Sequence, residues 1–360
     1  MRKKKIIIFL QDGVGGAERM SVLFGKSLPV EYFDVRFILV ERDSKTSIAD
    51  FIPKDYSIIR VPNSNPFKMM FQLFCIIRQE KPHVVFSSVM YLNTKILPFR
   101  LLFTSTQFVI RCENYLYTFS KKQHGIIRLT YRLADAIIAQ TQEMKDELVQ
   151  EMHIDDEKIN VLQNPIDAKL IDQMVAEGEN PYPQNGKKHF VASGRFAYQK
   201  GFDLLIKSFC LLTKKRNDVD LYIIGDKYYE GKSIYREIIN IAQENGLAEF
   251  IHCVGYQKNP YVYVKYADCF VLSSRWEGLP NVMIEALYLS TPVAAFKCIP
   301  VIERIAEEGK TGFLAEKEDV ASLSSAMEQA LGLGRVSSSY NPTSLLEFEK
   351  IVSVRTLDKT

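Results

Sequence analysis

The chain has 360 residues, of which 47% are hydrophobic and 25% are charged. A single hydrophobic core stops growing at about 250–300 residues, so this length indicates two domains. The formal net charge is only +3, which argues against a dedicated nucleic-acid-binding protein. Residues 1–165 carry 23 Lys/Arg and 18 Asp/Glu, so this half of the chain favours anionic partners more than the remainder does.

Cysteine spacing and hydropathy bear on the compartment. The six cysteines are scattered without a C-x-x-C pair, which predicts free thiols in a reducing compartment rather than disulfides or a zinc site. The apolar run after MRKKK is too short for a signal peptide, and no run approaches the roughly 20 residues of a membrane span. We therefore expect a cytoplasmic protein, with peripheral contact to the inner face of the plasma membrane still permitted.

In the first half of the chain, short β-rich runs alternate with helical patterns such as Glu18–Lys26, Phe67–Gln79 and Gln142–Gln150. Strands separated by helices predict parallel α/β units, and nearly continuous apolar strands predict a sheet that is covered on both faces. The expected strands are Lys5–Leu10, Val35–Val40, Ser57–Val61, His83–Val89, Gln107–Arg111 and Ala136–Ala139.

The run QDGVGGAERM follows the first expected strand and contains a glycine cluster. G-V-G-G alone is a weak dinucleotide fingerprint, because the third glycine is absent and Glu41 or Asp43 matches a ribose-binding acid only loosely. The alternative is a loop that closes over a diphosphate, with Gly15 and Gly16 allowing close approach. Motifs in the second half of the chain agree with this alternative.

A basic helix is expected over Ser120–Leu133. Its cationic and apolar stripes would suit an anionic lipid surface or the diphosphate of a lipid-linked acceptor. An ordinary solvated face, packed through one apolar stripe, explains the pattern equally well. The cationic stripe is Lys121, Arg128 and Arg132, and the apolar stripe is Ile126, Leu129 and Leu133.

The alternation stops between Ile166 and Lys188, where proline, glycine and acidic residues predict a linker with at most a short helix. It then restarts, so each half has the size of one doubly wound domain, whose ligands bind at the carboxyl ends of the strands. The expected strands are His189–Ser193, Asp220–Ile224, Phe250–Val254, Cys269–Leu272, Val293–Phe296 and Gly312–Ala315.

The segment SSRWEGLPNVMIEAL carries two carboxylates at a strand–helix junction. A helix over Asn281–Leu289 places Glu277 in the loop and Glu285 one turn into the helix. Backbone amides at Gly278–Val282 would face an anion, and each carboxylate could accept hydrogen bonds from a sugar diol. The alternative is a plain loop acid and a solvated helix acid.

A second candidate loop, SGRFAYQKG, begins at Gly194 and holds Arg195 and Lys200. These cations could reach a diphosphate and neutralise charge on a leaving group, although a surface Arg and Lys near a turn would look the same. The D-V-D run at Asp218–Asp220 is typical of a metal site in another enzyme class, but its polar surroundings favour a turn. We expect no metal cofactor.

Together these motifs resemble the retaining, family-4-type glycosyltransferases of the GT-B fold. The resemblance rests on GRF-x-x-QKG, LYIIGD, FIHCVGYQKNP and the pair Glu277…Glu285, with VGGAER, ADAIIAQTQEMKDEL and INVLQNPID also fitting. It implies two Rossmann-like domains with a cleft between them. Residues 1–165 would bind the acceptor and residues 166–339 the nucleotide-sugar donor, with a helix within 340–360 packing back on the first domain.

The resemblance also implies roles for individual residues. Arg195 and Lys200 would hold the diphosphate, Glu285 the ribose, and Glu277 the transferred sugar near its reacting carbon. The turn Gly255–Tyr256 would meet the base, and Gly225 would leave room for the nucleotide. The complete set expected to bind the donor is Gly15, Gly16, Arg195, Lys200, Gly225, Gly255, Tyr256, Gly278, Leu279, Asn281 and Glu285.

Catalytic residues on the acceptor side are less defined by the sequence. Many members of the family place a histidine after a middle strand, where this chain has VIRCENYLY. Glu113 could orient the acceptor and Arg111 could help neutralise the leaving group, or both could be structural.

The expected reaction moves a hexose or N-acetylhexosamine from a UDP-sugar to a glycan hydroxyl, releasing UDP. The EGLPN form and the N-P-Y-x-Y run look closest to bacterial enzymes of lipid-linked oligosaccharide, capsule and lipopolysaccharide assembly. N-acetylgalactosamine transfer to a polyprenyl-diphosphate glycan is the leading expectation. The alternatives are a sugar-nucleotide epimerase of the same fold, a non-catalytic glycan-binding relative, and a dehydrogenase, for which a full fingerprint is lacking.

Overall fold

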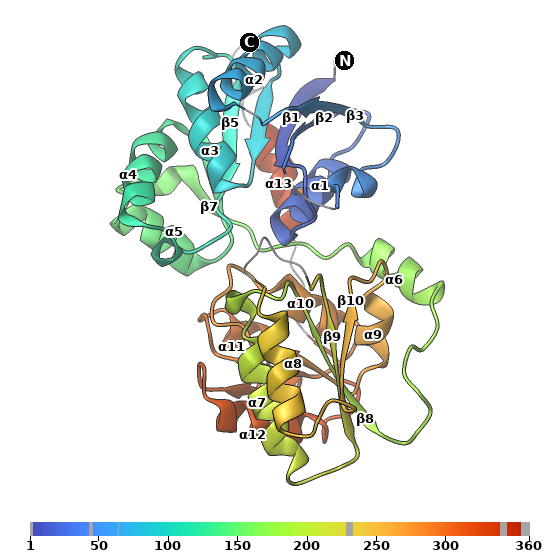
Figure 1. The fold of residues 1–360 in the computed structure, drawn as a ribbon. Helices are drawn as coiled ribbons and strands as arrows, with labels where there is room; N and C mark the ends of the chain where they lie inside the picture. Colours follow the sequence, from blue (N-terminus) through green and yellow to red (C-terminus); the bar gives the residue numbers. More distant parts are fainter. Residues whose placement is uncertain (1–2, 43–45, 64, 228–232, 339–343, 354–360) are drawn as a thin grey trace. The chain divides into compact units, whose positions relative to one another are not determined.

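The computed structural model describes residues 3–42, 46–63, 65–227, 233–338 and 344–353. The chain forms two compact units, one of Met1–Pro165 with Pro342–Thr360 and one of Ile166–Asn341. Each unit is built on one parallel sheet with helices along both faces (Figure 1).

The sheet of the first unit has seven parallel strands in the order β3-β2-β1-β4-β5-β6-β7. Its central strands are apolar throughout, and Ile6–Leu10 are fully buried, as expected for a sheet that helices cover on both faces. The short strand β7 was not predicted. The strands are β1 Lys4–Gln11, β2 Phe33–Val40, β3 Ser57–Val61, β4 Val84–Ser87, β5 Gln107–Arg111, β6 Ala136–Ala139 and β7 Ile159–Val161.

The helices of the first unit begin at local capping signals. Asn65 accepts hydrogen bonds from the amides of Phe67 and Lys68, and Ser120 forms a reciprocal capping box with Gln123. The helices are α1 Gly16–Ser27, α2 Pro66–Glu80, α3 Met90–Ile96, α4 Lys121–Thr130, α5 Gln142–Gln150 and α13 Ser344–Ser353. Short 3-10 turns span Ile48–Phe51, Leu97–Leu101, Leu116–Thr118, Tyr131–Leu133 and Asp156–Lys158.

Helix α13 completes the core of the first unit although it follows the second unit in the chain (Figure 1). Phe348 is fully buried, with its ring centroid 4.6 Å from that of Phe24 and 5.0 Å from that of Phe86. The first unit therefore depends on a segment that is remote in sequence.

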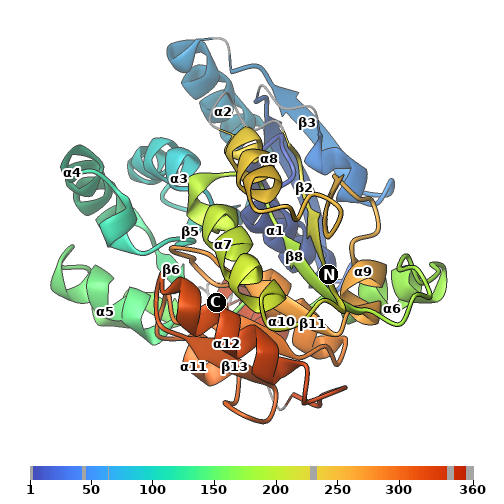
Figure 2. The same cartoon turned by 60° about the horizontal axis from the view of Figure 1, so that its bottom comes forward.

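The sheet of the second unit has six parallel strands in the order β10-β9-β8-β11-β12-β13. Helices α7 and α12 pack against each other beside it (Figure 2). The strands are β8 Lys188–Ser193, β9 Val219–Ile224, β10 Ile251–Gly255, β11 Cys269–Leu272, β12 Val293–Phe296 and β13 Gly312–Ala315. The helices are α6 Ala168–Ala176, α7 Phe202–Thr213, α8 Tyr235–Glu244, α9 Tyr261–Tyr266, α10 Asn281–Tyr288, α11 Ile302–Ile305 and α12 Val320–Ala330, with a 3-10 turn at Tyr198–Lys200.

Helix α4 differs from its prediction. It ends at Thr130, and its buried apolar contact is Ile127. Leu129 is 75% exposed and Ile126 is 43% exposed, so the expected packing through their stripe is wrong. In the described ranges no helix combines the length and apolar character that crossing a bilayer requires.

Candidate functional site

The strand order of the second sheet reverses between β8 and β11. Strands β9 and β10 lie on one side of this pair, and β12 and β13 lie on the other. Ligands of open α/β sheets bind outside the carboxyl ends of the strands at such a reversal. The two loops that leave this point, residues 194–200 and 273–280, are the segments that the sequence motifs single out.

Three predicted glycines lie side by side at this edge of the sheet. The Gly194 amide donates to the Ile224 carbonyl at 2.9 Å, and the Gly225 amide donates to the Gly255 carbonyl at 2.9 Å. Gly225 has a φ of +156°, and a β-carbon there would overlap the carbonyl oxygen of Gly194. Close backbone packing therefore explains why residue 225 is a glycine. The sequence had suggested a different reason, namely room for a ligand.

Lys200 and Glu277 form the charged centre of this edge. The Lys200 ammonium lies 2.7 Å from Glu277 Oε1, and the Ser274 hydroxyl donates to the same oxygen at 2.6 Å. The Glu277 residue is only 7% exposed. The methylene chain of Lys200 runs close over Gly194, where a β-carbon would lie 3.2 Å from it. The absence of a side chain at Gly194 therefore leaves room for the Lys200 side chain on its way to the Glu277 carboxylate.

This arrangement suits an anionic ligand that also carries hydroxyl groups. Within the described part of the chain, both hydrogen bonds to Glu277 end on Oε1, which leaves Oε2 able to accept from a ligand. An ammonium has three donors, so Lys200 could bind an anion while it keeps Glu277. The amides of Met283 and Ile284 in the first turn of α10 already donate to the Pro280 carbonyl, so the start of this helix adds the Val282 amide and the positive end of the helix dipole.

One expected amide donor is already used. The Asn281 amide donates to the Leu279 carbonyl at 2.9 Å, so it is not available to an anion as the sequence suggested. The expectation for Gly278 and Val282 is unaffected by this contact.

Glu285 lies one turn into α10, as predicted, and is half-buried. Its Oε1 accepts a hydrogen bond of 3.3 Å from the hydroxyl of Tyr261, which lies at the start of α9. The expected base-contacting residue Tyr256 is 48% exposed directly after β10, and Arg195 is exposed directly after Gly194. All these positions follow carboxyl ends of neighbouring strands.

Arg275 is a residue of this site that the sequence reasoning missed. It is 6% exposed and donates from both terminal nitrogens to the carboxylate of Asp203, at 2.9 and 2.6 Å. Asp203 is 72 residues away in the sequence, so spacing gave no sign of the pair. The available signal was a lone cation inserted between an apolar strand and an acidic loop.

In the first unit, the glycine loop joins β1 directly to α1. Gly15 caps this helix in an extended conformation, and Gly16 is its first residue. The preceding Asp12 is 8% exposed, accepts from the Ser47 hydroxyl at 2.6 Å and forms an ion pair with Arg60. These contacts hold the loop, whose helix amides could face an anion.

Arg111 ends β5 inside the first unit and is 1% exposed. Its guanidinium bonds to Asn164 and lies 6.0 Å from the centre of the Phe24 ring. Burial lowers its pKa to about 10, against the opposing charge of Glu113, which is half-buried. Of the two possibilities considered from the sequence, this burial favours a structural role for Arg111 and leaves Glu113 open.

Four of the buried polar atoms that have no partner in the described segments lie at the carboxyl ends of three strands of this sheet. They belong to residues at or just beyond the ends of β4, β5 and β6. Buried polar atoms are normally paired, so bound water or another polar group is expected there. The atoms are Ser87 Oγ, Arg111 Nε and Nη1, and Gln140 Oε1.

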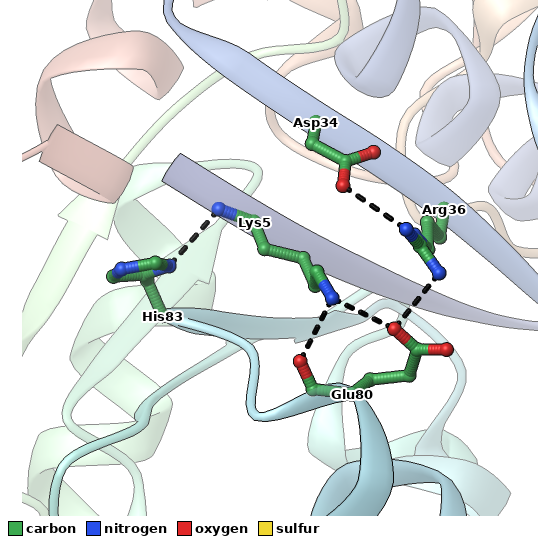
Figure 3. A network of polar contacts seen from close by, with 5 residues as sticks. All are labelled: Lys5, Asp34, Arg36, Glu80 and His83. Atoms are coloured by element: carbon green, nitrogen blue, oxygen red, sulfur yellow. Dashed lines mark hydrogen bonds and ion pairs between the residues drawn. The ribbon is translucent and has the colours of Figure 1, made fainter. Parts of the chain in front are cut away.

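A cavity of about 760 Å³ in the first unit opens at the opposite, amino-terminal edge of the sheet. Its charges neutralise one another, because Glu80 binds both Lys5 and Arg36 at 2.8 Å and Asp34 pairs with Arg36 (Figure 3). Strand carboxyl ends, not amino ends, carry ligand sites in such folds. We therefore do not assign the function to this cavity.

The aspartates of the D-V-D run have cationic partners. Asp218 pairs with Arg216 at 2.6 Å, and Asp220, within β9, pairs with Lys187 at 2.9 Å. Among the described residues, no group of three or more His, Cys, Asp or Glu side chains is arranged to hold a metal.

The fold is that of a two-unit α/β protein, and the second unit brings Lys200 and Glu277 together at the carboxyl ends of its strands. A family model described as glycosyl transferases group 1 matches residues 178–340, and one described as Glycosyltransferase Family 4 matches residues 14–170. The chain belongs to the glycosyltransferases and has the GT-B fold.

Relatives span different lengths of the chain. An uncharacterized glycosyltransferase of Methanocaldococcus jannaschii is 33% identical over 65% of the chain and 61% of its own length. The N-acetylgalactosamine-N,N'-diacetylbacillosaminyl-diphospho-undecaprenol 4-alpha-N-acetylgalactosaminyltransferase of Campylobacter jejuni is 25% identical over 98% of both chains. The structure of Anabaena HepE in complex with UDP and glucose superposes with a TM-score of 0.79, at 15% identity, over 97% of this chain and 98% of that one.

Proposed function

We propose that the chain transfers N-acetylgalactosamine, or a related hexose or N-acetylhexosamine, from a UDP-sugar to a polyprenyl-diphosphate-linked glycan with retention at the anomeric carbon. The second unit binds the donor and the first unit binds the acceptor. The Campylobacter relative, which is named for such a transfer and matches over nearly the full length, supports this choice of substrates. The UDP complex of the Anabaena structure supports the nucleotide.

The observation that carries the proposal is the contact between Lys200 and Glu277. A nucleoside-diphosphate sugar presents a diphosphate directly beside a ring of hydroxyl groups. The Lys200 ammonium, 2.7 Å from the Glu277 carboxylate, suits the diphosphate, and the carboxylate suits the sugar hydroxyls beside it. The N-terminus of α10 follows Glu277 in the chain and also favours the diphosphate. A nucleotide alone would need one carboxylate for its ribose, whereas this edge offers Glu277 in addition to Glu285.

The chemistry follows from these charges. The bond between the anomeric carbon and the diphosphate oxygen breaks, and the acceptor hydroxyl oxygen bonds to the same face of that carbon. The acceptor proton passes to a diphosphate oxygen. Negative charge grows on the departing UDP, where Lys200 and the amides of Gly278 and Val282 stabilise it. Glu277 holds the sugar hydroxyls so that the reacting carbon is correctly oriented.

The test is release of nucleoside diphosphate, UDP from a panel of UDP-sugars or GDP from GDP-mannose, with and without polyprenyl-diphosphate-linked acceptors. We expect release to require the acceptor and to be fastest with UDP-N-acetylgalactosamine. Proton NMR of the product should give the donor's anomeric configuration. Preference for GDP-mannose, or an inverted product, would overturn the proposed donor or stereochemistry.

The same assay separates the rival functions. An epimerase would convert the UDP-sugar to its isomer without an acceptor, and chromatography of the unreacted donor would reveal it. A non-catalytic relative would bind UDP-sugar in calorimetry but give no product.

We also propose that the first unit contacts anionic lipid. Residues 66–132 contain ten Lys/Arg and two Asp/Glu. Large apolar side chains on this segment are exposed to solvent, contrary to the usual preference for burial. They include Phe67 (86%) and Phe71 (66%) on α2, and Leu129 (75%) on α4.

These exposed side chains lie on neighbouring elements. Phe74 of α2 packs on Phe99 and Phe103, at 5.8 and 5.3 Å between ring centroids. Helix α4 contacts α3, and the 3-10 turns Leu97–Leu101 and Tyr131–Leu133 also contact each other (Figure 1, Figure 2). Cations around exposed apolar groups favour a lipid headgroup region.

Vesicle co-sedimentation tests this contact. We expect binding to phosphatidylcholine–phosphatidylglycerol vesicles, weakening with salt, and no binding to phosphatidylcholine alone. Phe71→Ser and Leu129→Ser should each reduce binding, whereas Tyr32→Ser, at a residue 62% exposed outside this segment, should not. Equal binding by all variants would exclude the assigned surface.

A further inference from the structure

We propose that Arg275 is a positioning residue, which locks the loop of Lys200 to the loop of Glu277 so that both charges meet the donor in one fixed arrangement. This inference rests on the proposed sugar transfer. Arg275 was not among the residues expected from the sequence, and we infer that it fixes the relative positions of two residues that were.

Arg275 joins the two loops directly. Its Nη1 donates to the Tyr198 carbonyl at 2.7 Å, and its backbone amide donates to the Gln199 carbonyl at 2.8 Å. Both acceptors lie in the 3-10 turn that ends at Lys200. Arg275 itself stands two residues before Glu277, so one residue bridges the two charged partners.

Further contacts close the same junction. Gln199 Nε2 donates to the Trp276 carbonyl at 3.0 Å, and the Ser273 hydroxyl donates to the Lys200 carbonyl at 2.9 Å. Gly201 has a φ of +60°, and a β-carbon there would overlap the Ser273 carbonyl oxygen. The two backbones are therefore in close contact on both sides of Arg275.

The guanidinium is anchored at its far end by Asp203 in α7. The two carboxylate oxygens accept from Nη1 and Nη2 at 2.9 and 2.6 Å, and both side chains are almost completely buried, at 7% and 9% exposed. A lysine cannot reproduce this planar fork. Loss of Arg275 would leave Asp203 as a buried unpaired charge, whereas loss of Asp203 would leave Arg275 with Glu318 as its anionic partner.

The remaining face of Arg275 is also occupied. Its Nε lies 3.1 Å from Glu318, and its guanidinium carbon lies 3.7 Å from the centre of the Tyr198 ring. Each of its three side-chain nitrogens thus has a protein partner. Arg275 acts on the reaction through Glu277 and Lys200 and does not itself contact the donor.

The function of the lock is geometric. A displacement of about 1 Å at a reacting centre costs on the order of 100-fold in rate. Lys200 and Glu277 lie on different loops, so their separation is fixed only as well as the loops are. A loosened junction lets the ammonium and the carboxylate keep their own contact while both move relative to the sugar.

The test compares Arg275→Lys, Glu277→Gln and the double variant in steady-state transfer. We expect Arg275→Lys to lower kcat by about 10- to 100-fold, with a smaller change in the Kd for UDP, because the proposed nucleotide contacts of Glu285 and Tyr256 do not depend on this junction. In the Glu277→Gln background, Arg275→Lys should lower kcat by a smaller factor than it does in the wild type, because one of the two charges that the junction positions is already removed.

The outcomes are distinct. Multiplicative losses in the double variant, or a kcat of Arg275→Lys within about threefold of wild type, would overturn the positioning role. If Arg275→Lys does not fold, Asp203→Asn, which keeps the volume and part of the hydrogen bonding, carries the same expectation. A wild-type chain that releases no UDP in the presence of any acceptor refutes the proposed transfer itself, and this is seen before any variant is made.

Discussion

The carbonyl oxygen of Gly194 occupies the space that a β-carbon on residue 225 would need. Each of the two glycines directly follows one of two neighbouring strands, β8 and β9. The backbone after β8 lies directly against the end of β9. A main-chain contact between Gly194 and Gly225 therefore fixes the start of the loop that carries Arg195 and Lys200. The position of this loop does not depend on side chains alone.

Gly225→Ala should disrupt this edge of the sheet. The added methyl group meets backbone, which cannot rotate away, so we expect a loss of about 1–3 kcal/mol in unfolding free energy and a weaker affinity for UDP. Chemical denaturation and calorimetry measure the two effects. Gly125→Ala is the control, because its β-carbon would meet no atom within 4 Å. Equal stability of the two variants would contradict the packing argument.

Glu277→Gln should lower turnover by at least about 100-fold while the fold is retained. The substitution keeps the shape of the side chain but removes the charge that faces Lys200 and the sugar hydroxyls. UDP release under saturating donor measures it. Glu303→Gln, at an exposed residue of α11, should retain wild-type turnover. Near-normal activity of Glu277→Gln would remove this residue from the active site.

Phe348→Ala should destabilise the first unit by about 3–5 kcal/mol, since it empties a fully buried position between two aromatic rings. Leu346→Ala on the same helix is the matched control, because Leu346 is 69% exposed. Urea unfolding followed by circular dichroism compares the two. Similar midpoints for both variants would show that α13 contributes nothing to the core.

Stability should fall as the pH drops below about 6.5, through His189 and His252. Burial lowers the pKa of both imidazoles, although Asp220 opposes the shift, so the unfolded chain binds more protons in acid. The stabilisation is complete above the unfolded pKa and is lost as the pH falls below it.

His189→Phe tests this pH dependence. His189 stacks on Tyr182 with ring centroids 4.4 Å apart, and phenylalanine keeps this stacking without titrating. Melting temperatures between pH 5.5 and 7.5 should change less in the variant than in the wild type. An unchanged pH profile would exclude His189 as a contributor.

Much of the fold follows from hydropathy and breaker residues. The strands Gln107–Arg111, Ala136–Ala139 and Cys269–Leu272 were predicted with the bounds that the structure has, because each is a short apolar run between turn signals. The strand Ile159–Val161 was missed, since three residues around an asparagine give no period. The expected strand His83–Val89 is cut to Val84–Ser87, because Met90 already begins α3.

The site was predictable where chemistry is local and not where it depends on long-range contacts. Glu277, Glu285 and Lys200 stand in recognisable loop and helix-start contexts, so the sequence indicates them. The partnership of Arg275 with Asp203 arises only when β8 and β11 become neighbours. The two alternatives for the apolar face of α4 could not be separated for the same reason, because only tertiary contact decides that Ile127 is buried while Ile126 is exposed.

The position of α13 has a consequence for biosynthesis. The ribosome makes β1 to β7 first and the entire second unit next, and only then Phe348. Until that residue emerges, Phe24 and Phe86 lack one wall of their packing. The second unit, to which α13 does not belong, can finish folding earlier. During synthesis, the first unit therefore stays incompletely folded for longer than the second, and chaperones and proteases have the longest access to it.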